Sequence, residues 1–390
     1  MVKKRNIGIV YNHSNNWIGG VYYIKGILKA LTKHSETVAI FLITGSEITK
    51  QKLYSEFSFS GAIQYSNSFF HRIIFKLFSG QLKALRFLSN IFFYNQKKSS
   101  SHLDVVFPCE SNLFFNIFDE WQKYYWIPDF QEHYYPEFFS NRELKFRYTK
   151  NNRIANSQSS VVFSSLAAKT DYEKIYPIKK TTDYVLNFVT NIQTDSFSDI
   201  GIVREKYGIS KKFILCSNQF WIHKNHKIII NAIIKLKKEY CDPLDFQIVF
   251  TGKEHDYRFP KLIEELKFTV TESSLDKDIL FLGFIPRLDQ KALLLYSHAL
   301  IQPSKFEGWN TSIEDAKVFS KVIIASDIPV HREQLGKNGL FFGVDDPDTL
   351  VTHLKNVTMN HVPLVIDYKY TESISRYEKG IAKIFYIVES

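Results

Sequence analysis

Short apolar runs rich in β-branched residues alternate with segments of helical periodicity along most of the chain. Helical patterns occupy residues 21–33, 224–240, 289–297 and 311–320. The runs that predict strands are residues 6–10, 37–43, 104–107, 124–127 and 160–165 in the first half, and 213–217, 246–252, 279–283, 299–304 and 322–326 in the second. Short strands that alternate with helices are typical of βαβ units, so the pattern predicts an α/β protein with parallel sheets.

A polar, turn-rich segment at residues 186–199 interrupts this alternation and predicts a domain junction. We expect an N-terminal Rossmann-like domain at residues 1–187, a C-terminal Rossmann-like domain at 188–370, and a terminal helix at 371–390 that is a candidate to pack back on the first domain. Open α/β sheets bind ligands beyond the carboxyl ends of their strands. The two sheets are therefore expected to face each other across a ligand-binding cleft.

Composition and charge narrow the class of protein. Of the 390 residues, 45% are hydrophobic and 23% are charged, which is typical of a globular chain. The net charge of +10 arises within residues 1–186, which suggests an acidic partner for the first domain. The three cysteines form no CxxC pair, and no apolar run is long enough for a signal peptide or a membrane span. We therefore expect a cytoplasmic protein.

Two motifs in βα turns could bind an anion. Gly19 and Gly20 follow the first strand, where glycine allows close approach of the backbone and the helix N-terminus favours negative charge, although a plain turn explains them too. Lys224 follows the first strand of the second half and could meet a phosphate or remain solvated. The flanking His223 and His226 have no further metal-type ligand near them in sequence, which disfavours a metal site.

The stretch KFEGWNTSIEDAKV at residues 305–318 holds three carboxylates, on Glu307, Glu314 and Asp315. Thr311 and Glu314 fit a capping box, with Thr311 as the N-cap. Asp315 then points about 100° away from Glu314 around the helix and can face the cleft. Carboxylates accept hydrogen bonds from sugar hydroxyls while amides and Lys224 attract phosphates, so this region suits a ligand with both groups.

The stretch SKFEGWNTSIEDAK resembles the E-x7-E region of the retaining glycosyltransferases of family 4, which have the GT-B fold. Other segments agree in order, namely SNQFWIHKNH, FLGFIPRLDQKALLLYSHALIQPS, ASDIPVHREQLGKNGLFFGVDDPDTL and WIPDFQEHYYPEFFS. The resemblance implies a metal-independent, cofactor-free transfer of sugar from a UDP- or GDP-linked donor to a saccharide acceptor, which could be polyprenyl-linked. It also suggests a role in surface polysaccharide biosynthesis, including lipopolysaccharide.

The resemblance also implies roles for individual residues. Glu307 matches the acid that contacts the donor sugar, Asp315 the acid that binds the ribose, and Lys224 the lysine at the diphosphate. Lys224 and Glu307 are accordingly the catalytic candidates. The expected donor-binding set is Gly19, Gly20, Gln219, Lys224, Arg287, Glu307, Gly308, Asn310, Thr311, Ser312 and Asp315.

Three positions depart from the family pattern. The second acid is Asp315 in place of Glu, and Gln219 replaces an arginine that binds phosphate, which leaves Arg287 as a possible substitute. The His-Asp of the acceptor domain is Pro128-Asp129 in this chain, so Asp129 and His133 are acceptor-side candidates. These departures keep open a nucleotide-sugar-binding module without catalysis. Another nucleotide-sugar enzyme on the same fold, such as an epimerase, is a further alternative.

Two more segments have competing interpretations. Residues 57–103 contain six Lys or Arg and no Asp or Glu, with apolar residues at helical spacing. They could contact a membrane surface through residues 69–98 or form an ordinary helix that packs on the first domain, whereas nucleic acid is disfavoured. The DDPD at residues 345–348 contains a D-x-D but predicts a helix start better than a metal site.

Overall fold

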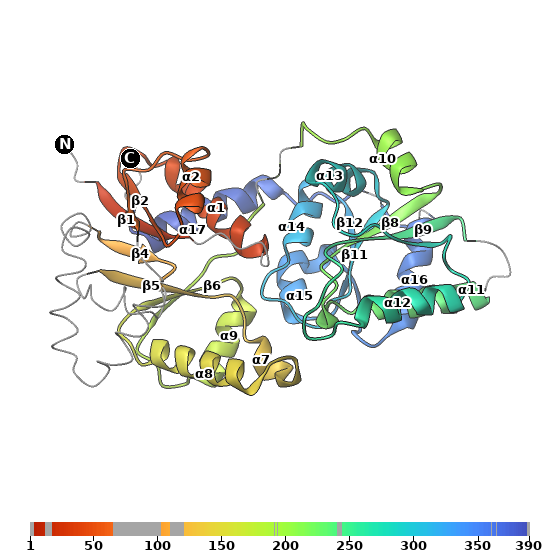
Figure 1. Cartoon of the computed structure of the whole chain (residues 1–390), viewed down its shortest axis with the longest axis horizontal. Coiled ribbons are helices and arrows are strands. Elements are labelled where there is room, and N and C mark those ends of the chain that lie inside the picture. Colours follow the sequence, from red (N-terminus) through yellow and green to blue (C-terminus); the bar gives the residue numbers. More distant parts are fainter. Residues whose placement is uncertain are drawn as a thin grey trace.

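The computed structural model describes residues 4–11, 18–64, 103–109, 121–190, 192, 194–239, 244–359, 361–363 and 365–387. Two parallel sheets, each with helices around it, lie side by side in the molecule (Figure 1). The strands alternate with helices along the chain, as the hydrophobic pattern predicts. The expected α/β class and the two facing parallel sheets are therefore confirmed.

The first sheet has the strand order β3-β2-β1-β4-β5-β6-β7. Its strands are β1 (Arg5–Val10), β2 (Val38–Thr44), β3 (Gly61–Gln64), β4 (Val105–Phe107), β5 (Gln122–Ile127), β6 (Ser160–Phe163) and β7 (Thr182–Val185). The helices near it are α1 (Ile18–Thr32), α2 (Glu47–Tyr54), α7 (Gln131–Tyr134), α8 (Asn141–Ala155) and α9 (Leu166–Ile175), with the 3-10 turn η1 (Pro136–Phe138). The order reverses between β1 and β4, so a crevice opens there.

The second sheet repeats this plan with the order β10-β9-β8-β11-β12-β13. Its strands are β8 (Lys212–Ser217), β9 (Phe246–Thr251), β10 (Ile279–Phe281), β11 (Ala299–Gln302), β12 (Val322–Ser326) and β13 (Leu340–Phe342). Its helices are α10 (Ile200–Tyr207), α11 (His226–Glu239), α12 (Leu262–Glu272), α13 (Arg287–Tyr296), α14 (Thr311–Val318), α15 (Pro329–Leu335) and α16 (Pro347–Thr358), with 3-10 turns η2 (Ile222–Lys224) and η3 (Gly336–Asn338). The order reverses between β8 and β11.

The last helix, α17 (Tyr370–Ile384), returns to the first sheet although it follows the second in sequence (Figure 1). Its buried residues Tyr377, Ile381 and Ile384 belong to the same core cluster as Ile7 and Ile9 of β1. An ion pair joins Glu378 to Lys33 with 2.5 Å between the charged atoms. The chain therefore crosses between the two sheets twice.

Three strands are missing from the sequence prediction, namely β3, β7 and β13. Each lies at an edge of its sheet. Edge strands bury one side less completely and are often short, so their apolar signal is weak. The strand β7 reads TDYV and has no fully buried residue, and β13 has only three residues.

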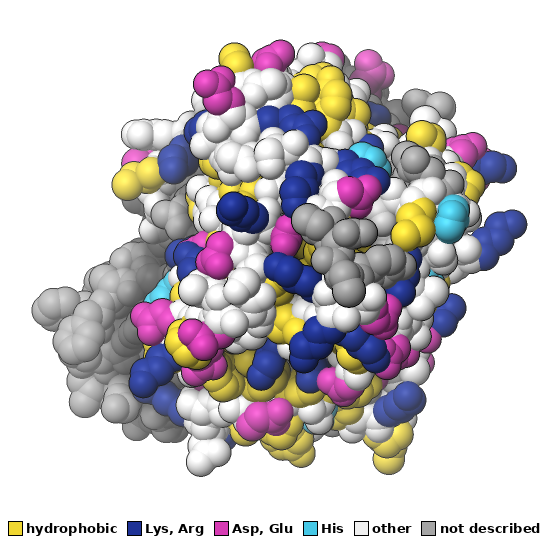
Figure 2. All heavy atoms as spheres, turned by 90° about the vertical axis from the view of Figure 1, so that its right-hand side faces the viewer, with side chains coloured by type: hydrophobic (Ala, Val, Ile, Leu, Met, Phe, Trp, Pro, Cys, Tyr) yellow, Lys and Arg dark blue, Asp and Glu magenta, His cyan; other side chains and the backbone are white. Residues whose placement is uncertain are grey.

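The face of the second domain that is remote from the first mixes Lys and Arg with Asp and Glu side chains (Figure 2). This mixture agrees with the sequence, in which the excess of basic residues belongs to the first half. Residues 69–98, the candidate membrane contact, lie outside the described residues. Within the described part of the chain, no helix has the length and apolar character needed to cross a membrane.

Candidate functional site

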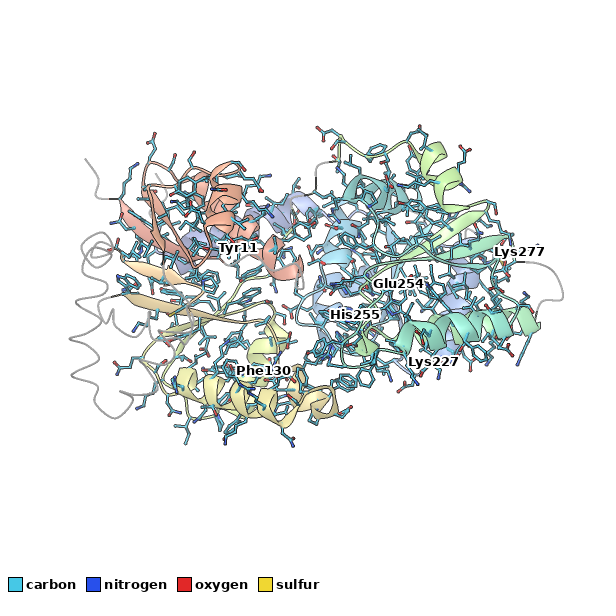
Figure 3. All side chains as sticks on the ribbon, in the orientation of Figure 1. Tyr11, Phe130, Lys227, Glu254, His255 and Lys277 are labelled. Carbon is cyan, nitrogen blue, oxygen red and sulfur yellow. The ribbon has the colours of Figure 1, made fainter. Side chains whose placement is uncertain are left out.

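A cavity of about 350 Å³ lies between the two domains and is lined by residues of both. From the second domain it receives the loops that follow β8, β9, β10 and β11, at the point where the strand order reverses. From the first domain it receives the start of α1 and the loop after β5. In Figure 3, Glu254 and His255 mark the loop after β9, and Phe130 marks the loop after β5.

Two charged residues of the cavity lining, Lys224 and Glu307, form an ion pair with 2.6 Å between Nζ and Oε1. Lys224 ends the turn η2, and Asn225 follows it in the left-handed region at φ 55°, which separates the turn from α11. The same Oε1 atom of Glu307 accepts hydrogen bonds from Ser304 Oγ at 2.7 Å and Asn310 Nδ2 at 2.8 Å. Three donors thus fix the orientation of this carboxylate.

The loop that carries Glu307 lies tightly against the first domain. A Cβ atom added to Gly308 would lie 2.5 Å from the carbonyl oxygen of Pro128, so only glycine fits there without a shift of backbone. The next residue, Trp309, donates its indole N–H to the carbonyl of Phe188 at 3.0 Å. These two contacts hold Glu307 at the boundary between the domains.

The helix α14 begins one residue earlier than the capping-box prediction requires. Asn310, not Thr311, is the N-cap, and its Oδ1 accepts from the backbone N–H of Ile313 at 3.1 Å. The predicted role of Thr311 as N-cap is therefore wrong. Asn310 takes the position because its amide can cap the helix and also donate to Glu307 and to Gln302, the latter at 3.1 Å. Thr311 and Ser312 then form the first turn, which lines the cavity.

Glu314 and Asp315 have different surroundings, although not for the predicted reason. Glu314 is 1% exposed and accepts from Lys317 Nζ and Gln334 Nε2, each at 3.0 Å. Its carboxylate thus has buried partners and does not close a capping box. Asp315 lines the cavity and accepts from Arg287 Nη2 at 2.6 Å. The interpretation of Glu314 as structural and Asp315 as cavity-facing agrees with these contacts.

Arg287 lies at the start of α13 and reaches the cavity beside α1. Its guanidinium stands 5.5 Å from the ring centroid of Tyr22, a cation–π contact between the two domains. Its Nη1 donates to Gln290 Oε1 at 2.8 Å, and Gln290 in turn donates to Ser217 Oγ at 2.6 Å. Arg287 is therefore held near Asp315. Gln219 also lines the cavity.

The first domain contributes Asp129 and Gly19 to the cavity lining. Loss of hydration raises the pKa of the Asp129 carboxyl, while nearby Arg147 acts in the opposite direction. Phe130, which is fully buried, anchors the loop that holds Asp129. Gly20 is buried in α1 and does not line the cavity, because the helix turns it away from the opening. His133 is exposed on α7, where it contacts the ring of Phe130 and lies outside the cavity lining.

The structure adds several site residues that the sequence reasoning missed. Asn218 Nδ2 donates to Gln302 Oε1 at 2.7 Å, which joins the ends of β8 and β11 beneath the cavity. Lys253 is an exposed cation on the cavity wall. Gly252 precedes it with φ 147°, and a Cβ atom there would lie 1.8 Å from the carbonyl oxygen of Asn218. The glycine that follows the apolar run of β9 is the sequence feature that could have indicated this loop as part of the site.

Both histidines beside Lys224 are buried, and His223 also lines the cavity. His226 stacks on Phe220 with 4.3 Å between ring centroids, and burial lowers its pKa to about 3. Burial likewise lowers the pKa of His223, with a further contribution from Lys224. In the described part of the chain, no group of three or more His, Cys, Asp or Glu side chains is placed to hold a metal ion.

The D-x-D segment at residues 345–348 begins a helix. Asp346 is the N-cap of α16, as the Asp-Pro-Asp pattern predicts.

Comparison with solved structures shows the class of fold. The chain is similar to Alr3699/HepE of Anabaena in complex with UDP and glucose, at 16% identity and a TM-score of 0.65, over 98% of this chain and 94% of that one. It is also similar to a glycosyltransferase of Rickettsia africae, at 15% identity and a TM-score of 0.67, over 98% and 93% of the two chains. The fold is GT-B, in agreement with the sequence expectation.

Sequence comparison gives the family of the second domain. Residues 199–371 match the family model described as "Glycosyl transferases group 1". The O-antigen chain mannosyltransferase RfbU of Salmonella typhimurium is 24% identical over 253 residues, which are 65% of this chain and 64% of RfbU. The match therefore covers slightly less than two thirds of the length of RfbU. The chain thus has the GT-B fold, and its residues 199–371 are similar to the group 1 glycosyltransferases.

Proposed function

We propose that this protein transfers a sugar from a UDP- or GDP-linked donor to a saccharide acceptor, with retention of the anomeric configuration. The observation that carries the proposal is the Lys224–Glu307 pair, which stands inside the interdomain cavity beside the first turn of α14. The match to the group 1 family and the likeness to RfbU support it. The name of RfbU makes mannose the first donor sugar to test.

The proposed chemistry depends on electrostatics. Departure of a nucleoside diphosphate builds negative charge on its phosphates, which the ammonium of Lys224 and the first-turn N–H groups of α14 would stabilise. Glu307 would accept hydrogen bonds from the sugar, and Asp315 from the ribose. Because these groups supply the positive charge, we propose that transfer needs no metal ion. Gln219 stands where the family pattern has an arginine that binds phosphate. We propose that Lys253 supplies the positive charge in its place.

The acceptor would approach from the first domain. Asp129 lines the cavity from the first domain, so we propose that its carboxyl contacts an acceptor hydroxyl. The name of RfbU and the resemblance in sequence support a role in surface polysaccharide biosynthesis, with a saccharide acceptor that could be polyprenyl-linked. We also propose a location at the cytoplasmic face of a membrane, supported by the basic, apolar sequence of residues 69–98.

A thermal-shift screen across UDP- and GDP-linked sugars tests the donor site. We expect one nucleotide to raise Tm in the wild type and to lose most of that effect in Lys224→Ala. Lys305→Ala is the matched control, because Lys305 is a neighbouring lysine that pairs with Asp345 outside the cavity lining. No stabilisation by any nucleotide sugar would count against the donor site.

An assay of the stabilising donor with a panel of saccharides then tests transfer. Product that forms without an acceptor would favour a hydrolase or an epimerase, and tight binding without any turnover would favour a binding module. The anomeric configuration of the product, determined by NMR, tests retention. Activity that survives exhaustive chelation is expected, whereas its loss and restoration by a divalent metal would contradict metal independence.

A further inference from the structure

A second cavity, of about 340 Å³, lies next to the first on the side of α1 and α13. The two cavities share Tyr22 and Arg287, whose cation–π contact forms part of the wall between them. The remaining lining of the second cavity includes Lys25 and Lys29 from α1 and Lys291 from α13. Neither Lys224 nor Glu307 reaches it. It is therefore a separate compartment beside the candidate donor site.

Four cationic side chains converge on this cavity from two helices of different domains. Lys25 and Lys29 are four residues apart on α1, and Arg287 and Lys291 are four residues apart on α13, so each pair lies on one helix face. Like charges at this spacing destabilise a helix. Among the described residues that line the cavity there is no Asp or Glu. The cavity thus concentrates positive charge that an anion would relieve.

Neighbouring groups offset this charge only in part. Lys25 Nζ pairs with Glu56 at 2.6 Å, but that carboxylate is 44% exposed and does not line the cavity. Arg287 pairs with Asp315 on the side of the first cavity. Lys291 is 5% exposed, and its Nζ donates to the neutral hydroxyl of Ser196 at 3.1 Å. The convergence of four cations on a described lining without Asp or Glu therefore favours an anionic ligand.

Apolar side chains form another part of the wall. Val189 is buried and Phe57 is partly buried at the edge of the same core cluster. A cavity with cations on one side and apolar groups on another suits a phosphate that is esterified to an organic group. We infer that the second cavity binds the phosphate or diphosphate group of an organic ligand other than the donor. The inference depends on the proposed function only in the assignment of the first cavity to the donor.

Isothermal titration of the whole chain with inorganic diphosphate tests the site. We expect two diphosphates to bind per chain, one in each cavity. Lys29→Glu should weaken one of the two by about tenfold or more, because it removes a charge-assisted contact and adds repulsion. Lys52→Glu is the control, since Lys52 is an exposed lysine of α2 that lines neither cavity. Lys25→Gln provides a second, milder variant, and circular dichroism confirms that each variant is folded.

Lys224→Ala separates this inference from the proposed function. This variant should abolish diphosphate binding in the first cavity. Binding in the second cavity, which Lys29→Glu weakens, should remain. If Lys224→Ala changes nothing while Lys29→Glu removes one diphosphate, the donor assignment fails and the second site stands. One diphosphate in the wild type that only Lys224→Ala removes would overturn the second site. Equal binding by Lys29→Glu and Lys52→Glu would overturn it too.

Competition experiments identify the source of the phosphate. In Lys224→Ala, farnesyl diphosphate and a hexose 1-phosphate are each titrated against bound inorganic diphosphate. Displacement by farnesyl diphosphate alone would indicate a lipid-linked ligand, for which Phe57 and Val189 provide apolar contact. Displacement by the hexose phosphate alone would indicate a soluble sugar phosphate. If neither displaces the diphosphate, the assignment to an organic ligand is wrong.

Discussion

Glu314 and Asp315 are adjacent carboxylates on α14 that serve different purposes. Glu314 is enclosed with Lys317 and Gln334, whereas Asp315 meets Arg287 at the cavity. Because a helix advances about 100° per residue, two neighbours on a buried helix must face different surroundings. The identity of those surroundings depends on α15 and α13, which come from other parts of the chain.

Asp315→Asn should weaken donor binding by more than it lowers stability. The asparagine keeps the shape but loses the charge that pairs with Arg287 and that, under the proposed function, would accept from ribose hydroxyls. Glu314→Gln should instead lower the free energy of unfolding by about 3 kcal/mol, since it leaves the Lys317 ammonium without its buried counter-ion. Urea unfolding and donor titration of both variants measure these effects. The opposite pattern would show that the two roles are exchanged.

His226 makes stability sensitive to acid. Burial lowers its pKa to about 3 in the folded state, below the ordinary 6.5. Because the unfolded state binds the proton more tightly, the stabilisation by neutral His226 is fully present above pH 6.5. It is lost progressively as the pH falls toward 3. The full difference corresponds to about 5 kcal/mol. His331, with a pKa of about 4 through burial, acts in the same direction.

His226→Phe should therefore flatten the loss of stability between pH 6.5 and 4. The phenyl ring keeps the stacking on Phe220 and removes two ring nitrogens that have no hydrogen-bond partner among the described residues. Urea unfolding at several pH values measures the change, with His361→Phe at an exposed site as the control. A pH profile of His226→Phe that matches the wild type would contradict the prediction.

At the scale of elements, the ends of strands and the starts of helices form the site. Lys224 follows β8, whereas Glu307 and Asp315 follow β11, and the two segments meet because parallel strands end at the same edge of a sheet. The close packing of these loops demands glycine at two points. Gly308 lies against Pro128 of the other domain, and Gly252 lies against Asn218 of the neighbouring loop.

Gly252→Ala should destabilise the protein far more than Gly208→Ala. Both glycines have positive φ, at 147° and 67° respectively, but only Gly252 also has a backbone atom in the space of the new methyl group. We expect a loss of about 1 kcal/mol for Gly208→Ala from its left-handed conformation. Gly252→Ala should cost about 3 kcal/mol or more and should also lower donor affinity. Similar unfolding free energies for the two variants would refute this difference.

At the scale of the whole molecule, Glu333 joins the domains on the side of α15 and α9. Its two carboxylate oxygens accept from the backbone N–H groups of Leu166 at 2.8 Å and Ala167 at 3.2 Å. Asn187 Nδ2 donates to Oε1 of the same residue at 2.9 Å. A negative charge at the N-terminus of α9 is favourable, so this contact helps to set the relative orientation of the domains.

Glu333→Gln should loosen that orientation with little effect on either core. We expect a larger radius of gyration in small-angle scattering and a lower kcat/KM, while the unfolding free energy falls by about 1 kcal/mol. Glu173→Gln on α9 is the control, because Glu173 is exposed and pairs with Lys169 of its own helix. Scattering curves that coincide for both variants and the wild type would show that Glu333 does not set the arrangement.

The sequence by itself determined the alternation of strands and helices, because burial in a parallel sheet leaves an apolar run that is visible without neighbours. It also placed Lys224 and Glu307 in segments that follow strands, and Asp315 on the helix after Glu307. The edge strands β3, β7 and β13 and the N-cap at Asn310 could not be predicted, since partial burial and competing hydrogen bonds weaken the local signal. Only the tertiary structure decided that Glu314 is enclosed and that four cations of α1 and α13 share one cavity. Those outcomes depend on contacts between residues far apart in sequence, which no local pattern records.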